Sequence, residues 1–499
     1  MKQRIIAAIL CMTAAASLCA CQANPQNGIV TSKNDGSFDA SSVKSAENST
    51  EKIQSIDCTD SFSSTDGSVT FTVDIHEQIQ MSALPVVEVA PHTFTTEDAK
   101  NIAAALFGDA QLYETEPEKQ LSKAEIRENL ALWSQYLNKE KLLTLYLAEN
   151  IDDADTLFAE MSRIIQAYID KYTAMIETAP DVVEQTPCQW TFYPDTHYYY
   201  TQEELETLQF KEKSNLIISA WSEVADIPYR FSVSNRDEND YKIHNSFTYI
   251  MDEDSPNGIN KAIILSELCR AGVPTEEQME SAKKKAFEIL YEMGIGDWNV
   301  DQCYYEPLGF GGQDKYTIYV NAVPVFNGIP VVRQVQLGNL KSTESYASNY
   351  YYTDASFRFT TDGCLLSCTI ISPVDVVQIL NDNVQTLEFD ELLEKAKTHL
   401  SLYDYYEYAK DVMYDSEQVF DCTVNITEME YGLTRVKVPN TKDSYYYVPA
   451  ITLRGNYQAY AADSGERWFD SNDWWNGEQQ TLLVLNAVDG SVINVSNGY

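Results

Sequence analysis

The densest group of residues suited to recognising a ligand lies near the end of the chain, at positions 468–478. Three tryptophans stand there among carboxylates and amides. Flat rings beside such polar groups bind sugars and peptides by stacking and hydrogen bonding. A long hairpin connection whose tryptophans pack onto a sheet would give the same pattern, and both interpretations stay open. The candidate ligand-binding residues are Trp468, Trp474, Trp475, Asp470 and Asp473.

Signatures of common hydrolases are missing from the sequence. The five histidines lack the H-E-x-x-H and H-x-x-E-H spacings of zinc proteases, and no G-x-S-x-G elbow or P-loop occurs. Seven thiols leave a cysteine nucleophile formally open, without a local signature to mark one. We therefore expect no catalysis, no cofactor and no metal. A hydrolase built from two carboxylates stays open, because 75 acidic residues offer many pairs.

Two acidic loops share some features of calcium sites, which are rich in oxygen ligands. Asp252 and Asp254 take the first and third positions of an EF-hand-like loop, but Pro256 takes the fifth. Residues 470–478 depart from that pattern in a similar way. We interpret both loops as turns.

The first 20 residues have the parts of a secretory signal: Lys2 and Arg4, an apolar run at 5–16, and small residues before a cut. Leu18-Cys19-Ala20 before Cys21 resembles the lipobox of bacterial lipoproteins, which implies that Cys21 is lipidated with a diacylglycerol. An ordinary cleaved signal peptide is the alternative. Acyl chains would anchor the protein, since each buried methylene contributes about 0.8 kcal/mol. Residues 21–67 are polar and predict a disordered tether.

The charge balance is strongly acidic, with a net charge of −40 that becomes −42 when Lys2 and Arg4 leave with the leader. Such a field repels phosphate backbones and anionic lipids, so we exclude nucleic acid as a partner. The membrane would be reached through the lipid on Cys21 alone. Cationic partners are favoured electrostatically, although acidity for solubility alone explains the same balance.

Cysteine usage gives no disulfide framework. Seven cysteines follow Cys21, so at least one stays unpaired. Cys364 and Cys368 lie on one expected strand and would be about 13 Å apart, too far for a disulfide. We interpret most of the seven as small buried apolar residues.

The elements expected in the first half are two strands and a set of helices. Residues 68–75 alternate apolar and polar, a second strand follows at 86–89, and Thr95 caps a helix that ends at Gly108. Residues 122–179 have helical periodicity, which favours an antiparallel helical pair packed on the sheet over a membrane-active stripe. We expect an N-terminal α+β domain at 68–274 with a helical insertion.

The second half contains one arrangement twice, at 275–385 and 386–499. Each copy has a helix, at 276–293 and 390–400, followed by antiparallel strands. In the second copy the strands are expected at 419–429, 434–438, 445–457 and 482–495. Each copy closes in a tight Asp-Gly turn, Asp362-Gly363 and Asp489-Gly490.

This helix-then-meander order, closed by residues 482–493, resembles PepSY-type modules and the YycI-like regulatory proteins of Gram-positive bacteria. The whole mature chain is similar in style to lipoproteins of gut Clostridia. The resemblance implies a binding or inhibitory role and brings no catalytic residues. The fold class predicted is α+β, with N-terminal strands and a helical pair, then two PepSY-like units.

Taken together, the sequence predicts a lipid-anchored, extracytoplasmic binding or regulatory protein on the outer side of the cell membrane of a Gram-positive bacterium, with a protein partner in that membrane. One alternative is a carbohydrate- or peptide-binding lipoprotein that serves a transporter. A carboxylate-based hydrolase is the third.

Overall fold

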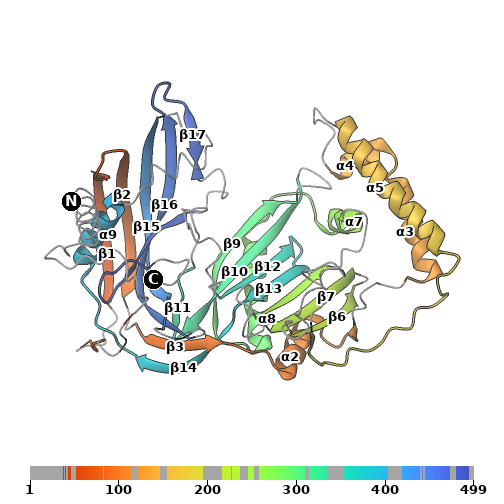
Figure 1. Cartoon of the computed structure of the whole chain (residues 1–499), viewed down its shortest axis with the longest axis horizontal. Coiled ribbons are helices and arrows are strands. Elements are labelled where there is room, and N and C mark those ends of the chain that lie inside the picture. Colours follow the sequence, from red (N-terminus) through yellow and green to blue (C-terminus); the bar gives the residue numbers. More distant parts are fainter. Residues whose placement is uncertain are drawn as a thin grey trace, which may run out of the picture. The chain divides into compact units, whose positions relative to one another are not determined.

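The structure, a computed structural model, describes residues 38, 40, 43–46, 52–81, 84–114, 121–146, 154–194, 216–225, 227–235, 245–251, 258–308, 314–333, 353–402, 419–438, 441, 444–471 and 479–493. The fold is α+β, as expected. Two compact units share the chain (Figure 1): unit 1 takes its described residues from 38–89 and 376–493, and unit 2 from 90–333 and 353–375.

Unit 2 is built on a ten-stranded sheet with the order β11-β10-β12-β13-β8-β7-β6-β4, in which β5 pairs with β6 and β9 pairs with β10. Its pairs are antiparallel. The strands are β4 (Tyr113–Glu114), β5 (Tyr193–Pro194), β6 (Leu216–Val224), β7 (Ile227–Asn235), β8 (Ser246–Met251), β9 (Trp298–Pro307), β10 (Tyr316–Phe326), β11 (Ile329–Pro330), β12 (Asp354–Thr360) and β13 (Leu365–Ile371).

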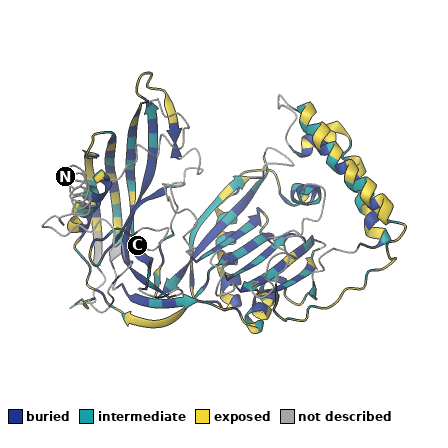
Figure 2. Ribbon diagram, viewed as in Figure 1, coloured by how far each residue is buried: buried dark blue, intermediate teal, exposed yellow. Residues whose placement is uncertain are grey.

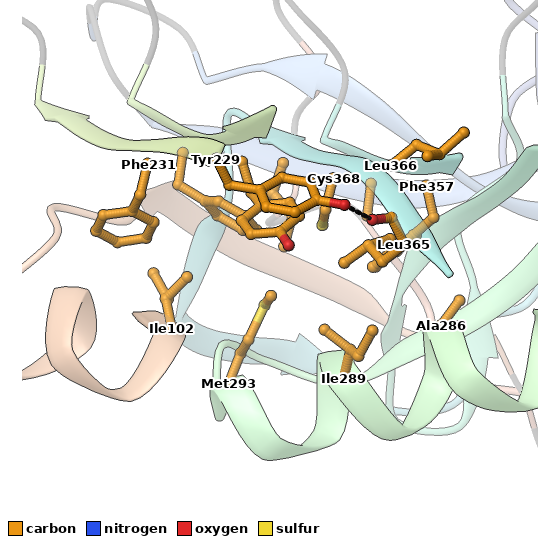
Figure 3. Packing of buried hydrophobic residues seen from close by; sticks show 14 of the residues in the cluster. Ile102, Tyr229, Phe231, Ala286, Ile289, Met293, Phe357, Leu365, Leu366 and Cys368 are labelled. Atoms are coloured by element: carbon orange, nitrogen blue, oxygen red, sulfur yellow. Dashed lines mark hydrogen bonds between the residues drawn. The ribbon is translucent and has the colours of Figure 1, made fainter. Parts of the chain in front are cut away.

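Helices α2 (Thr96–Phe107) and α8 (Glu276–Met293) cover one face of this sheet (Figure 3). Both begin with a capping box, at Thr95, where the sequence predicts a helix cap, and at Thr275. Ile102 and Met293 point toward the buried rings of the strands, and the Tyr229 hydroxyl donates to the Leu365 carbonyl at 2.9 Å. Because every second strand residue enters this core, the opposite face of the sheet carries the polar residues.

A second core in unit 2 belongs to the helices α3 (Lys123–Gln135), α4 (Lys139–Leu145), α5 (Ala154–Met175) and α7 (Ile259–Leu268). Trp133 is fully buried there, and its ring nitrogen donates to Asn260 Oδ1 at 2.9 Å. The apolar stripe of 157–175 thus packs against other helices. In the part of the chain that the structure describes, no helix is both long and apolar enough to cross a bilayer.

Unit 1 is built on an eight-stranded sheet with the order β1-β2-β15-β16-β3-β14, in which β17 and β18 also pair with β16. Helix α9 (Phe389–Leu402) contributes to its core. The strands are β1 (Lys52–Ser63), β2 (Val69–Met81), β3 (Val86–Pro91), β14 (Val374–Asn381), β15 (Phe420–Lys437), β16 (Tyr445–Ala461), β17 (Arg467–Asp470) and β18 (Gln480–Asn486). The two strands expected at 419–429 and 434–438 are one strand, β15, with an irregularity between Ile426 and Glu428.

The expected tether at 21–67 is wrong for its second half. Strand β1 pairs with β2 over its whole length, and Phe38 is buried in a cluster with Val86 and Val384. Residues 44–46 pair with residues 383–385. An edge strand with one solvated face needs few apolar residues, so a polar composition alone does not indicate disorder.

The expected domain boundaries also differ from the compact units. Strand β2 pairs in parallel with β15, more than 300 residues later, so the segments expected as the domains 68–274 and 386–499 share one sheet. Most of β14, expected in the unit 275–385, belongs to unit 1. The two helix-then-strand segments exist, but each is part of a larger sheet. Pairing between distant segments leaves no mark on local periodicity.

Candidate functional site

The residues expected to bind a ligand divide into two groups. Trp468, on β17, has 45% of its surface exposed, and its ring centroid lies 5.9 Å from that of Phe420, edge to face. Asp470, on the same strand, is buried. Asp473, Trp474, Trp475 and the lipidation candidate Cys21 lie outside the described residues.

Asp470 uses its carboxylate inside the protein. Its oxygens accept hydrogen bonds from Gln458 Nε2 at 2.8 Å, Arg467 Nη1 at 3.1 Å and Asn456 Nδ2 at 3.4 Å. A buried carboxylate satisfied by three donors holds its neighbours in place. Asp470 is therefore a positioning residue, and a ligand would meet the groups that it orients.

Those groups belong to a line of polar side chains that we call the β16 polar row: Thr452, Arg454, Asn456 and Gln458. They alternate with Ile451, Leu453 and Tyr457, which enter the core of unit 1, so the row lies on the other face of the sheet. Glu430, Glu428 and Asn425 of β15 stand opposite Thr452, Arg454 and Asn456.

Hydrogen bonds tie the row into a network across four strands. Thr72 of β2 donates to Asn425 Oδ1 at 2.7 Å, and Asn425 Nδ2 donates to Asn456 Oδ1 at 3.0 Å. Asn456 continues to Asp470 of β17. Such a network has little freedom to rearrange, so its donors and acceptors keep fixed positions.

The charges of the row are partly buried. Arg454 is only 4% exposed as a side chain, and its Nη2 lies 2.7 Å from Glu430 Oε2, with Nε at 2.9 Å from the same oxygen. Burial raises the pKa of Glu428. The Arg454 cation lowers this pKa in part, and the Glu430 carboxylate raises it further. The Thr452 hydroxyl is fully buried and without a hydrogen-bond partner among the described residues.

A glycine allows the two long strands to approach at this point. A Cβ on Gly455 would lie 1.7 Å from the carbonyl oxygen of Asn425, far inside contact distance. The β15–β16 pairing shifts register between Ile426 and Glu428, beside that contact. Irregularities of this kind re-aim side chains and are common next to binding sites.

Unit 2 carries a second polar surface, which the sequence analysis missed. The strand registers place one polar residue from each of seven adjacent strands in a line that spans roughly 29 Å. Asn321 in this line is 4% exposed, and its Nδ2 lacks an acceptor among the described residues. This hydroxyl row consists of Ser219, Ser232, Thr248, Thr369, Ser356, Asn321 and Gln302.

The next line on the same face holds aromatic and cationic side chains. Trp221 stands opposite Arg230, and Arg358 opposite Tyr319. The Arg358 guanidinium lies over the Tyr319 ring at 5.2 Å from its centroid and donates to Thr317 Oγ1 at 3.1 Å. The signal that could have found this surface is the alternation of Ser and Thr with apolar residues in each strand.

Cys269, Cys303 and Cys368 are poor nucleophiles. All seven cysteines after Cys21 are free, and three of them are buried. Burial raises the pKa of Cys269 and of Cys303 to about 11 and places that of Cys368 well above its usual range. Within the described residues, no three His, Cys, Asp or Glu side chains gather as a metal site would require.

Comparisons with known proteins identify no family. No family model and no curated protein matches the chain. An uncharacterized protein from Eubacterium rectale has a solved structure that aligns over 86% of this chain and 91% of its own, with 10% identity and a TM-score of 0.32.

Proposed function

We propose that this chain is a non-catalytic binding or regulatory protein, held on the outer face of a bacterial membrane by a lipid on Cys21, and that Trp468, on the strand that the β16 polar row orders, contacts a protein partner in that membrane. The observation that carries the proposal is the network of Thr72, Asn425, Asn456 and Asp470, which fixes amides and charges at the sheet end where Trp468 is exposed. Exposed aromatic rings beside ordered polar groups are typical of binding surfaces.

The internal hydrogen bonds support recognition over turnover. The carboxylate of Asp470 is committed to Asn456, Gln458 and Arg467. The raised pKa values of Cys269 and Cys368 leave little thiolate on these two residues at neutral pH. The PepSY-like resemblance of 275–385 and 386–499, where each helix precedes antiparallel strands, agrees with a binding role.

A second candidate, carbohydrate or peptide binding in the service of a transporter, is favoured by the unit 2 face. A line of hydroxyls and amides beside Trp221, Arg358 and Tyr319 offers hydrogen bonds and stacking surfaces together. This combination suits an extended, uncharged sugar chain. A hydrolase would in addition need two carboxyl groups about 5 to 10 Å apart at that face.

The test is cross-linking in the native envelope followed by mass spectrometry, comparing the intact protein with Trp468→Ala. Tyr291→Ala, which removes another exposed ring, is the matched control. We expect one membrane protein to be lost from the Trp468→Ala sample alone. Unchanged cross-links in both variants would contradict the proposal, and direct binding of neutral oligosaccharides would favour the second candidate.

A further inference from the structure

Strand β14 exposes more apolar surface than an edge strand normally does (Figure 2). Five of its eight residues are large aliphatics, and four of these are exposed, with exposed fractions of 52% for Val376, 56% for Val377, 51% for Ile379 and 37% for Leu380. Natural sheets protect their edges with charges, prolines or a covering segment, because a bare apolar edge pairs with other chains. An edge left in this state indicates an interaction surface.

The outer edge of β14 is open for strand pairing. In the sheet order β14 is terminal, and among the described residues it pairs with β3 alone. Two side-chain contacts lie on the β3 side: Gln378 Nε2 donates to Glu88 Oε2 at 2.6 Å, and Asp375 Oδ1 lies 2.8 Å from His92 Nδ1. At the end of the strand, Asn381 Nδ2 donates to Ser45 Oγ at 3.2 Å. A row of main-chain donors and acceptors therefore faces outward.

The chain itself adds a strand to the continuation of this edge. Just past β14, the Val384 amide donates inward to Leu84, while the Gln385 amide donates to Lys44 and the Asn383 carbonyl accepts from Ala46. Residues 44–46 thus form a short antiparallel addition on the outer side. A few residues earlier, the same edge has no strand partner among the described residues, so it can take a longer segment in the same way.

Charge and geometry select the occupant. Asp375 and Asp382 flank the aliphatic residues. An antiparallel pair of β14 strands from two copies, centred on the aliphatics, would bring these acids opposite one another, and each copy carries a net charge of −40. A bilayer would touch one face only, whereas Val376 and Val377 point to opposite faces.

We propose that β14 is a strand-addition site for an extended segment of another protein, with adjacent aliphatic residues at its centre and lysines or arginines at both ends. The partner segment pairs with the outer edge of β14, covers its aliphatics on both faces and places its cations near Asp375 and Asp382. The proposal extends the binding function proposed above, on which it rests, and assigns the partner's chemistry to a surface separate from the β16 polar row.

The test uses a fluorescent eight-residue peptide with a lysine at each end and two pairs of adjacent valines between them, so that valines lie on both faces of the strand. It is titrated into the full mature chain, and the same peptide with glutamate at each end is the charge-reversed control. The double variants Val377→Thr, Ile379→Thr and Val376→Thr, Leu380→Thr remove apolar surface from one face each while keeping good strand formers. Because these side chains are exposed, the variants stay folded. Val182→Thr, at 76% exposed, is the matched control.

We expect each double variant to weaken binding of the lysine peptide by about tenfold or more, and Val182→Thr and Trp468→Ala to leave it unchanged. Hydrogen exchange of alternate β14 amides should slow when the peptide binds. Absent binding, or equal binding to the double variants, overturns the proposal. The proposal is also overturned if the double variants reduce vesicle binding or dimer formation and leave peptide binding unchanged. Loss of the Trp468 cross-links is a separate readout, so failure of this proposal can be told apart from failure of the proposed function.

Discussion

Phe38 fixes the first described segment of the chain to the sheet of unit 1. Its side chain is 3% exposed, its ring meets the Tyr446 ring edge to face at 6.0 Å, and it packs with Val86 and Val384. The change Phe38→Ala removes this contact and leaves the main chain intact. The Phe38 ring thereby holds residues 43–46 on the sheet.

The size of the effect follows from the contacts. Truncating a buried phenylalanine to alanine costs about 3–5 kcal/mol. The main-chain bonds of Ala46 to Asn383 and of Gln385 to Lys44 contribute roughly 0.5–1.5 kcal/mol each. A loss of about 3 kcal/mol raises the open population of the segment roughly 100-fold, since a factor of ten is 1.36 kcal/mol. Unit 1 as a whole should lose less, because the segment can leave without unfolding the sheet.

Hydrogen exchange with mass spectrometry measures this opening directly. In Phe38→Ala the amides of Ala46 and Gln385 should exchange much faster, while the core of β16 keeps its protection. Val182→Ala, at an exposed position, is the control and should change nothing. Unchanged exchange at Ala46 and Gln385 would refute the docking of this segment and restore the longer tether expected from sequence.

Three further predictions follow from unit 1 and the thiols. Gly455→Ala should lower the unfolding free energy of unit 1 by about 3 kcal/mol or more, because the added Cβ clashes with the Asn425 carbonyl. Gly465→Ala, in open space at φ +68°, is the control and should cost about 1 kcal/mol. Equal losses of the two variants in urea unfolding would contradict the pairing of β15 with β16 at Gly455. Burial and the nearby Lys395 lower the pKa of His399. Below about pH 6.5 the unfolded chain therefore binds a proton that the folded chain does not, and the melting temperature should fall as the pH drops toward the folded pKa. His399→Leu should weaken this dependence of the melting temperature on pH, and an unchanged dependence would contradict the prediction. Cys368 should resist iodoacetamide at pH 8 until the chain unfolds, because burial raises its pKa. Rapid labelling of Cys368 itself in the folded protein, located by peptide mass spectrometry, would contradict its burial.

Local features were predictable from sequence. The helix caps at Thr95 and Thr275, the helix near 390–400 and the turns at Gly363 and Gly490 all appear in the structure. Each depends on residues within one or two turns of the chain, where side-chain periodicity and capping act.

Long-range features were not predictable. The parallel pairing of β2 with β15 joins residues that local patterns treat as separate domains. The burial of Phe38 depends on Val384 and Tyr446, and no property of residues 38–46 alone reveals it. Sequence separation hides these contacts, because a strand's partner is set by the whole sheet.

The candidate site was predictable in part. The sequence left open whether Trp468 binds a ligand or packs on the sheet; in the structure it is 45% exposed and its ring also meets Phe420. Asp470 faces inward to Asn456 and Gln458. Arg454 and Asn456 match no motif, since polar residues at alternate positions of a strand normally face solvent. Their partners on β15 become visible only when the register across the irregularity at Ile426 is known.

Site-specific photo-cross-linking tests the central claim most directly. A photoreactive amino acid at position 468, with one at position 291 as the exposed control, is activated in the native envelope and the adduct is identified by mass spectrometry. The account predicts one membrane-protein adduct from position 468 that position 291 does not give. No protein adduct from position 468, or the same adducts from both positions, would contradict it.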